Sequence, residues 1–227
     1  YPPTMASYLA SLAPDTQLAV DVGCGTGQLT RLLAPHFRHV IGIDPSADQI
    51  ANAVQAENIS YQCSPAEHLQ LMEGSVDLIT AAQAAHWFNL LSFYQEVRRV
   101  GRAEAVLSLI SYGVPNLGHG LNDRFQHFYW HEIGSFWPPE RKLVDSGYAT
   151  LDFPFLELEP PPAAIRLQWD LRELLGYLTT WSAVRHAQEV GREEVLRNFA
   201  RDLNRLWGNA DTKRVIIWKV QMRIGRL

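Results

Sequence analysis

Cysteine is scarce in this sequence, which contains only Cys24 and Cys63 among 227 residues. A framework of several disulfides, of the kind that holds small secreted domains together, is therefore excluded. Cys24 also stands inside a glycine-rich turn, which is an awkward place for a disulfide. This cysteine usage predicts a reducing, cytoplasmic setting.

Long apolar runs and an excess of basic residues are also missing. No stretch of about 18 apolar residues occurs, so we expect no transmembrane helix and no membrane partner. No secretory leader is visible either, although a start at Tyr1 without methionine predicts a trimmed N-terminus. The formal net charge is −4, whereas a nucleic-acid binder usually carries a basic face. We therefore expect no nucleic-acid partner.

What is present fits one globular domain with an appended lobe. Hydrophobic residues make up 47% of the 227 residues, enough for a sizeable core. The clearest local signal is Leu18–Thr30. An apolar run ends in Gly23, Gly25 and Gly27, and leucines at helical spacing follow. A strand, a glycine turn and a helix open a βαβ nucleotide-binding unit, because a ligand can approach the main chain where no Cβ intervenes.

Strands and helices alternate over the first half of the chain. Further strands are predicted at 39–44, 59–63, 75–80 and 105–110, with helices at 46–56 and 91–100. The second half is rich in proline and aromatic residues, with a strand at 151–158, helices at 171–185 and 189–207, and a strand at 214–224. We predict a Rossmann-like, seven-stranded, mostly parallel sheet whose last strand is antiparallel, with helices on both faces and a helical, aromatic lid.

The residues around the glycine turn select the ligand. A dinucleotide site favours Gly-x-Gly-x-x-Gly, but the sixth position here is Gln28. Asp21, before the turn, would repel a pyrophosphate but suits an ammonium group. Asp44 follows Gly23 by 21 residues, the place of an acid that binds ribose hydroxyls. S-adenosylmethionine (SAM) carries an ammonium and a ribose but no phosphate, so the pattern predicts SAM and disfavours NAD.

Asp21-Val-Gly-Cys-Gly-Thr-Gly27 resembles the first motif of class I SAM-dependent methyltransferases, of the methyltransferase type 11 group. Gly42–Ser46 resembles their ribose motif, Ser64–Glu67 their adenine-edge segment, and Ala81–Phe88 their fourth-strand motif. More narrowly, Gln83–Phe88 is similar to a subgroup that includes trans-aconitate methyltransferase, as are Tyr1-Pro2 and Tyr177–Ser182. The resemblance implies these cofactor-binding residues: Asp21, Gly23, Cys24, Gly25, Gly27, Gln28, Asp44, Pro45, Ser46, Ser64, Ala66, Glu67, Ala81 and Gln83.

Two residues after the fourth predicted strand bear on the reaction. His86 lies just past the strand's carboxyl end, where α/β folds place their active sites. Its imidazole would act as a general base for a phenol or a carbon acid. A carboxylate acceptor is already ionised at pH 7 and needs no base, so His86 would then orient the acid or pack beneath the cofactor. Trp87 is expected in the pocket wall.

Aromatic residues of the second half are candidates for an apolar pocket over the methyl group, and the substrate-binding set is Tyr112, Trp137, Tyr177 and Trp181. Arg166, Arg172 and Arg185 are candidates for holding a substrate carboxylate. His119, His127 and His131 lie close in sequence, but no nearby cysteine or glutamate completes a tight set, so no metal is expected.

These observations predict one methyltransferase domain over 1–227. It divides into a SAM-binding core at 1–112, a substrate lid at 113–210 that contains the 151–158 strand, and a closing strand within 211–227. The expected reaction is in-line transfer of the SAM methyl to a small molecule, on a carboxylate oxygen, by a monomer or homodimer. Two alternatives stay open: transfer to carbon or a phenolic oxygen with His86 as base, and a non-catalytic SAM-binding protein.

Overall fold

The computed structural model describes residues 1–118 and 120–227. Two units make up the chain, and each is assembled from separate stretches. The core unit contains Tyr1–Tyr112, Leu143–Ala163 and Val220–Leu227, and the helical unit contains Gly113–Lys142 and Ala164–Lys219. The first boundary falls directly after Tyr112, where the composition of the sequence changes.

The sheet has the expected class. Its strands are β1 (Leu18–Val22), β2 (His39–Asp44), β3 (Ile59–Cys63), β4 (Val76–Ala82), β5 (Gly101–Tyr112), β6 (Leu156–Leu158) and β8 (Arg214–Arg226). They lie in the order β3-β2-β1-β4-β5-β8-β6, while β7 (Ala163–Trp169) pairs with β8 outside this path. Strands β1 to β5 run parallel, and β8 runs antiparallel to β5 and β6. The predicted seven-stranded sheet with an antiparallel last strand is confirmed, with one further strand.

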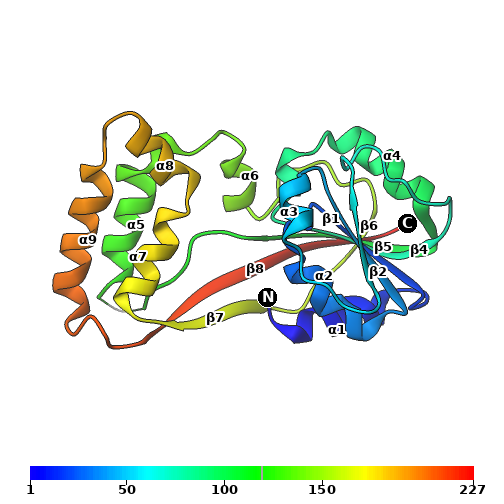
Figure 1. Cartoon of the computed structure of the whole chain (residues 1–227), viewed down its shortest axis with the longest axis horizontal. Coiled ribbons are helices and arrows are strands. Elements are labelled where there is room, and N and C mark those ends of the chain that lie inside the picture. The colour runs from blue at the N-terminus through cyan, green and yellow to red at the C-terminus, as the bar shows by residue number, and fades with distance from the viewer. Residues whose placement is uncertain (119) are drawn as a thin grey trace. The chain divides into compact units, whose positions relative to one another are not determined.

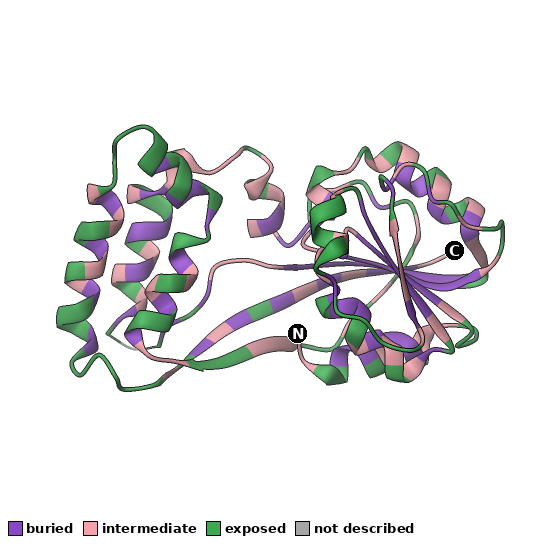
Figure 2. Ribbon diagram, viewed as in Figure 1, coloured by how far each residue is buried: buried purple, intermediate pink, exposed green. Residues whose placement is uncertain are grey.

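Helices flank this sheet within the core unit. They are α1 (Pro3–Leu12), α2 (Gln28–Leu33), α3 (Ala47–Ala51) and α4 (Leu90–Val100), with 3-10 turns η1 (Ala34–His36) and η2 (Ala85–Trp87). Helices α1 and α2 lie on one side of the strands and α4 on the other (Figure 1). Because both faces are covered, β1 and β4 are buried along nearly their whole length, as their continuous apolar runs indicate (Figure 2).

Helix α4 shows how local sequence sets these elements. Asn89 caps its N-terminus by accepting a hydrogen bond from the Ser92 backbone. Phe93, Val97 and Val100 then form a buried stripe at helical spacing. Asn89 itself donates its N–H to Glu67 Oε1, over 2.7 Å. The β4–α4 connection, which carries η2, is therefore tied to the loop after β3.

The helical unit contains α5 (Asn122–His127), the π-helical turn η3 (Phe128–Glu132), η4 (Gly134–Phe136), α7 (Leu171–Thr179), α8 (Ser182–Glu189) and α9 (Glu194–Trp207). Helix α6 (Arg141–Asp145) joins it to the core unit. Aromatic rings fill its interior, with Phe125, Phe128 and Phe199 all fully buried. Rings of Phe128 and Phe199 stack with centroids 4.0 Å apart.

Several predicted bounds are wrong in the second half. The strand expected at 151–158 is confined to Leu156–Leu158, because Pro154 has no N–H for a sheet ladder and Phe153 is buried in the core instead. Strand β7 was missed after the proline run 160–162. The two helices expected at 171–185 and 189–207 are three: the Asp170–Glu173 capping box starts α7 where expected, but the chain breaks at Thr180–Trp181, and α8 ends at Glu189, before α9 begins at Glu194.

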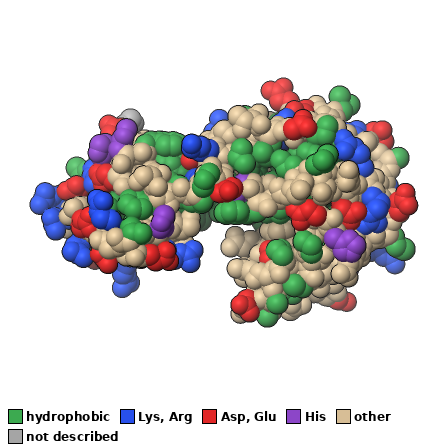
Figure 3. All heavy atoms as spheres, turned by 90° about the horizontal axis from the view of Figure 1, so that it is seen from above, with side chains coloured by type: hydrophobic (Ala, Val, Ile, Leu, Met, Phe, Trp, Pro, Cys, Tyr) green, Lys and Arg blue, Asp and Glu red, His purple; other side chains and the backbone are tan. Residues whose placement is uncertain are grey.

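No helix in the described part of the chain combines the length and apolarity that a bilayer-spanning segment needs. On the face shown in Figure 3, acidic and basic side chains are interspersed rather than gathered into a patch of one sign.

Candidate functional site

The turn after β1 is shaped by three glycines with left-handed backbone conformations. The φ angles of Gly23, Gly25 and Gly27 are 70°, 54° and 83°, a region that side chains with a Cβ rarely adopt. The N–H groups of Gly23 and Cys24 both donate to the Ile43 carbonyl, over 2.7 and 3.0 Å. These bonds fix the turn against the carboxyl end of β2, and Gly27 becomes the N-cap of α2.

Neighbouring side chains leave no room for a Cβ at two of these glycines. A Cβ on Gly23 would lie 2.3 Å from that of Ala84, and one on Gly27 would lie 2.1 Å from Tyr61 Oη. Gly25 differs, since its nearest neighbour would be 3.7 Å away and it lines a cavity. Gly23 and Gly27 therefore pack tightly against the protein, whereas a ligand in the cavity can approach the main chain at Gly25.

Asp21 is the buried charge of the site. Its side chain is 1% exposed, and its two carboxylate oxygens accept hydrogen bonds from Thr30 Oγ1 (2.7 Å) and Thr80 Oγ1 (2.9 Å). Burial raises the pKa of Asp21 to about 6, and the two threonine hydroxyls only partly oppose that rise. A buried carboxylate that lines a cavity is suited to a cationic ligand group, which would lower this pKa again.

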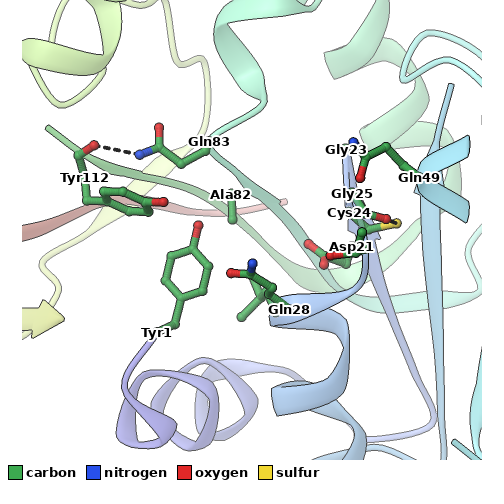
Figure 4. Close-up of a pocket in the computed structure, with 12 residues that line it drawn as sticks. Tyr1, Asp21, Gly23, Cys24, Gly25, Gln28, Gln49, Ala82, Gln83 and Tyr112 are labelled. Atoms are coloured by element: carbon green, nitrogen blue, oxygen red, sulfur yellow. Dashed lines mark hydrogen bonds between the residues drawn. The ribbon is translucent and has the colours of Figure 1, made fainter. Parts of the chain in front are cut away.

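The cavity at this turn has a volume of about 230 Å³ and lies within the core unit. Figure 4 shows the glycine turn, Asp21 and Gln49 at one end and Gln83, Tyr112 and Tyr1 at the other, with Gln28 and Ala82 between them. The full lining is Tyr1, Asp21, Gly23, Cys24, Gly25, Thr26, Gln28, Leu29, Gln49, Ala82, Gln83 and Tyr112.

Gln83, at one end of the cavity, has a strained backbone conformation. Its φ is 55°, which is uncommon for a residue other than glycine, asparagine or aspartate. Its N–H donates to the Ile110 carbonyl (2.8 Å), and its Nε2 donates to the Tyr112 carbonyl (2.6 Å; Figure 4). Both bonds reach β5, so the end of β5 compensates the strain and places the amide beside Tyr112.

Asp44 ends β2 as the sequence predicts. Its Oδ2 accepts from the Gly25 N–H and its Oδ1 from the Ser46 N–H, each over 2.9 Å. The carboxylate therefore braces the glycine turn, and its remaining lone pairs can accept further hydrogen bonds. Ser46 in turn caps α3 by accepting from the Gln49 N–H.

Asp44 and Ser46 do not themselves line this cavity, and neither do the remaining predicted cofactor residues. Pro45 is exposed, Ala81 is buried in the core, and Gly27 is buried against Tyr61. The Ser64 N–H donates to the Asp44 carbonyl (3.2 Å), which places the 64–67 loop beside the end of β2. Ala66 packs in the core there. Glu67 accepts from the Asn89 N–H, so its carboxylate has a partner within the protein.

His86 and Trp87 lie on η2, just beyond β4. His86 is half-buried and outside the cavity lining, and its Nδ1 is 2.9 Å from Tyr148 Oη. Trp87 is 63% exposed and its ring centroid lies 4.9 Å from that of His86. Both occupy the edge of the sheet where Gln83 reaches the cavity.

Three of the four predicted substrate residues belong to the helical unit. There the Trp137 and Tyr177 rings flank Trp181, with centroids 5.3 and 5.6 Å from it. Only Tyr112 lines the cavity of the core unit. The candidate carboxylate ligands, which also lie in the helical unit, are all exposed: Arg166, Arg172 and Arg185.

Metal-ligating side chains do not converge in the described residues: no group of three or more histidines, cysteines, aspartates or glutamates there is placed to hold an ion. His127 and His131 are neighbours, with ring centroids 5.0 Å apart. The third histidine considered, His119, lies outside the described residues.

Five lining residues were not among those predicted: Tyr1, Thr26, Leu29, Gln49 and Ala82. Thr26 lies within the glycine motif, and Leu29 and Ala82 adjoin predicted positions, so these three could have been found by neighbourhood in sequence. Tyr1 belongs to a stretch that resembles the methyltransferase subgroup, but nothing local assigns Tyr1 or Gln49 to the cofactor site. Only the tertiary fold brings them to the cavity.

Comparison with known proteins agrees with this geometry. The family described as methyltransferase domain matches residues 20–109. A Dictyostelium discoideum protein named as a methyltransferase is 36% identical over 197 residues, which is 86% of this chain and 75% of that protein. A Saccharomyces cerevisiae protein named as an S-adenosylmethionine-dependent methyltransferase is 32% identical over 124 residues, 51% of this chain and 43% of that one.

Solved structures include one from Anaeromyxobacter dehalogenans, named as a type II methyltransferase. It is 39% identical in sequence and superposes with a TM-score of 0.93, covering 100% of this chain and 96% of that one. The similarity therefore extends through both units and is not limited to the nucleotide-binding half.

Proposed function

Because the chain belongs to the methyltransferase-domain family and is a SAM-dependent enzyme, we propose that it methylates a carboxylate oxygen of a small organic acid. The observation that carries the acceptor class is the chemistry of the cavity lining. Among the lining side chains, Asp21 is ionised at pH 7, since burial raises its pKa only to about 6. Burial raises the pKa of the Cys24 thiol, which keeps it protonated. A carboxylate acceptor suits such a site, because it is already ionised at pH 7 and needs no general base in the lining.

The residues present fit the cofactor. When bound, SAM supplies an electrophilic methyl group on a sulfonium. In our proposal Asp21 pairs with the cofactor's ammonium. The methionine part of SAM lies against Gly25, where no Cβ intervenes. Asp44 accepts from the ribose hydroxyls with lone pairs that the Gly25 and Ser46 N–H groups leave available. At about 230 Å³ the cavity is smaller than most whole-ligand pockets, so the adenine would extend beyond it toward Ser64–Glu67.

The acceptor would be held by orientation rather than by proton abstraction. His86, at the carboxyl edge of β4, donates a hydrogen bond to the acid in this proposal, and Tyr112 and Tyr1 form an aromatic wall, with centroids 5.8 Å apart. Alignment of two bound reactants supplies much of such an acceleration. Trp137, Tyr177 and Trp181, which cluster within the helical unit, stay predicted substrate-binding residues. The reducing cytoplasm is the proposed location, with a monomer or homodimer as the working form and no nucleic acid as partner.

The proposal is tested with S-adenosylhomocysteine (SAH), the product form of the cofactor, and labelled SAM. Calorimetric titration should show SAH binding, and a screen of small carboxylic acids and phenols should show methyl transfer to an acid. Absence of SAH binding would overturn the proposal. Binding without transfer to any acceptor would favour a SAM-binding protein that does not catalyse.

His86→Ala should lower kcat/KM for the acid about 10- to 100-fold and leave the Kd for SAH unchanged, because one oriented hydrogen bond to a charged group is lost. The wild-type rate with the acid should be flat above about pH 7, because the carboxylate acceptor and Asp21 are both already ionised there. Transfer to phenols or carbon acids, with a rate that rises with pH through one ionisation and disappears in His86→Ala, would instead establish the general-base mechanism.

Cofactor affinity should depend on pH through Asp21. The pKa of this carboxyl is about 6 in the free protein, and pairing with an ammonium favours its ionised form. SAH binding should therefore be constant above pH 7 and weaken by up to about tenfold per unit below pH 6. Calorimetry between pH 5 and 8 checks this dependence. An affinity that stays constant across this range would show that Asp21 does not pair with the ligand.

A further inference from the structure

Tyr148 lies outside every predicted motif, yet it contacts His86. It belongs to the segment that follows α6 and returns to the core unit. Its side chain is fully buried, at 0% exposure, and its Oη lies 2.9 Å from His86 Nδ1. The two rings have centroids 6.1 Å apart. A buried phenol directed at one nitrogen of a half-buried imidazole has the geometry of a positioning residue.

The backbone around Tyr148 is held in an unfavourable conformation. Gly147 and Tyr148 have φ values of 65° and 63°. Their N–H groups donate to the carbonyls of Val144 (2.9 Å) and Leu143 (2.8 Å), which closes the end of α6. A left-handed conformation at a tyrosine costs roughly 1–2 kcal/mol, so tertiary contacts must compensate it.

Those contacts come from β8. The guanidinium of Arg223 donates to the carbonyls of Tyr148 (3.2 Å) and Leu151 (2.6 Å), and it lies 4.6 Å from the ring centroid of Phe153. Gly147 packs closely on Gln221 of β8: a Cβ there would lie 2.0 Å from the Gln221 side-chain oxygen, so a larger residue would displace that side chain as well as strain the backbone. The strand thus fixes the tyrosine's backbone, and with it the position of the phenol.

We propose that Tyr148 holds His86 as the tautomer that carries its proton on Nε2, and that the site thereby selects an anionic acceptor. A phenol is a stronger hydrogen-bond donor than acceptor, and an unprotonated imidazole nitrogen accepts well. Tyr148 therefore donates to Nδ1, and the proton of the neutral ring resides on Nε2.

This assignment rests on the proposed function and specifies its acceptor class. An imidazole with Nε2–H can donate a hydrogen bond to a carboxylate but cannot remove a proton from a phenol or a carbon acid at that nitrogen. The opposite direction of the Tyr148 bond would present a bare Nε2, which is a base. One hydrogen-bond direction thus separates carboxylate methylation from the general-base alternatives.

Nitrogen-15 NMR of histidine-labelled protein tests the tautomer without any activity measurement. At pH 8.5 the His86 ring is expected to show a protonated Nε2 and an unprotonated, hydrogen-bonded Nδ1. In Tyr148→Phe the two tautomers should mix. The matched control is Tyr94→Phe, because Tyr94 is also buried but donates to the Asp152 carbonyl (2.8 Å). It should leave the His86 signals unchanged. A protonated Nδ1 in the wild type, or unchanged His86 signals in Tyr148→Phe, would overturn the proposal.

Kinetics then separates positioning from a general structural effect. Tyr148→Phe should raise KM for the acid acceptor or lower kcat about tenfold, with the Kd for SAH and the thermal midpoint within error of Tyr94→Phe. Equal losses in both variants would contradict a role specific to His86. If SAH fails to bind the wild type, the proposed function fails, while the NMR result still decides the tautomer.

Discussion

Replacing Asp21 with asparagine should weaken SAH binding at pH 7 by at least about 100-fold, because a buried charge facing a cationic group is lost. The same change should stabilise the protein without ligand. Calorimetric titration measures the first effect, and urea unfolding measures the second. Asparagine keeps the size of the side chain and can still bond to Thr30 and Thr80, so both effects report on charge.

The sign of the stability effect follows from the raised pKa. Burial moves the pKa of Asp21 from 3.8 to about 6, so the folded state binds this proton more tightly than the unfolded state does. Stability is fully retained below pH 3.8 and is lost as the pH rises toward 6, by roughly 3 kcal/mol at pH 7. Asp21→Asn removes that cost but also loses charge-assisted bonds, so a net gain of about 1 kcal/mol is expected at pH 8, and it should turn into a net loss of about 2 kcal/mol near pH 4, where the wild-type carboxyl is protonated.

Asp77 provides the matched control. It is also fully buried, but it accepts from the N–H groups of Gln17 and Leu18, and its Oδ1 lies 3.0 Å from Arg102 Nε. Asp77→Asn leaves this guanidinium without its buried partner, so it should destabilise the protein and leave SAH binding unchanged. Stability losses of the same sign in both variants would show that Asp21 is an ordinary structural carboxylate.

Gly27→Ala should have the second large effect. The left-handed backbone costs an alanine roughly 1 kcal/mol, and its Cβ would lie 2.1 Å from Tyr61 Oη. Tyr61 would have to move and would lose its hydrogen bond to the Val54 carbonyl (2.7 Å). We expect a loss of about 3 kcal/mol in unfolding free energy and at least about tenfold weaker SAH binding. Urea unfolding and calorimetry measure both.

Gly74→Ala isolates the backbone contribution, because Gly74 has φ 62° and no atom within 4 Å of the added Cβ. It should cost only about 1 kcal/mol and leave SAH binding intact. Without the Tyr61 ring, the steric cost disappears. In a Tyr61→Ala background, Gly27→Ala should therefore lower the unfolding free energy by only about 1 kcal/mol. A Gly27→Ala protein as stable as Gly74→Ala would show that Tyr61 yields easily and does not support the turn.

Sequence reasoning succeeded where the determinants are local. The turn glycines sit between a buried strand and a helix, and Asp44 ends the next strand at the expected distance, so short-range spacing was sufficient. The parallel pairing of β1 to β5 follows from the alternation of strands and helices, since parallel strands need crossovers. These features do not depend on which distant side chain packs against them.

The residues that sequence reasoning missed act across long separations. Thr80 bonds to Asp21 from 59 positions away, and Tyr148 bonds to His86 from 62 positions away. Tyr61 looks like any strand tyrosine until Gly27 and Gly42 are seen to pack against its ring. No local pattern marks such pairs, because register and packing of whole elements bring them together.

The division of the chain has a consequence for how the protein is made. The polypeptide passes between the two units four times, and β8 itself runs from the helical unit, through Lys219, into the core unit at Val220. β5 cannot pair along β8 until residues 220–226 have left the ribosome, more than 100 residues after Tyr112. During that interval the edge of a buried, apolar strand is open to other chains. We therefore infer that folding during synthesis depends on protection of β5, and that neither unit can be expressed as a simple contiguous fragment.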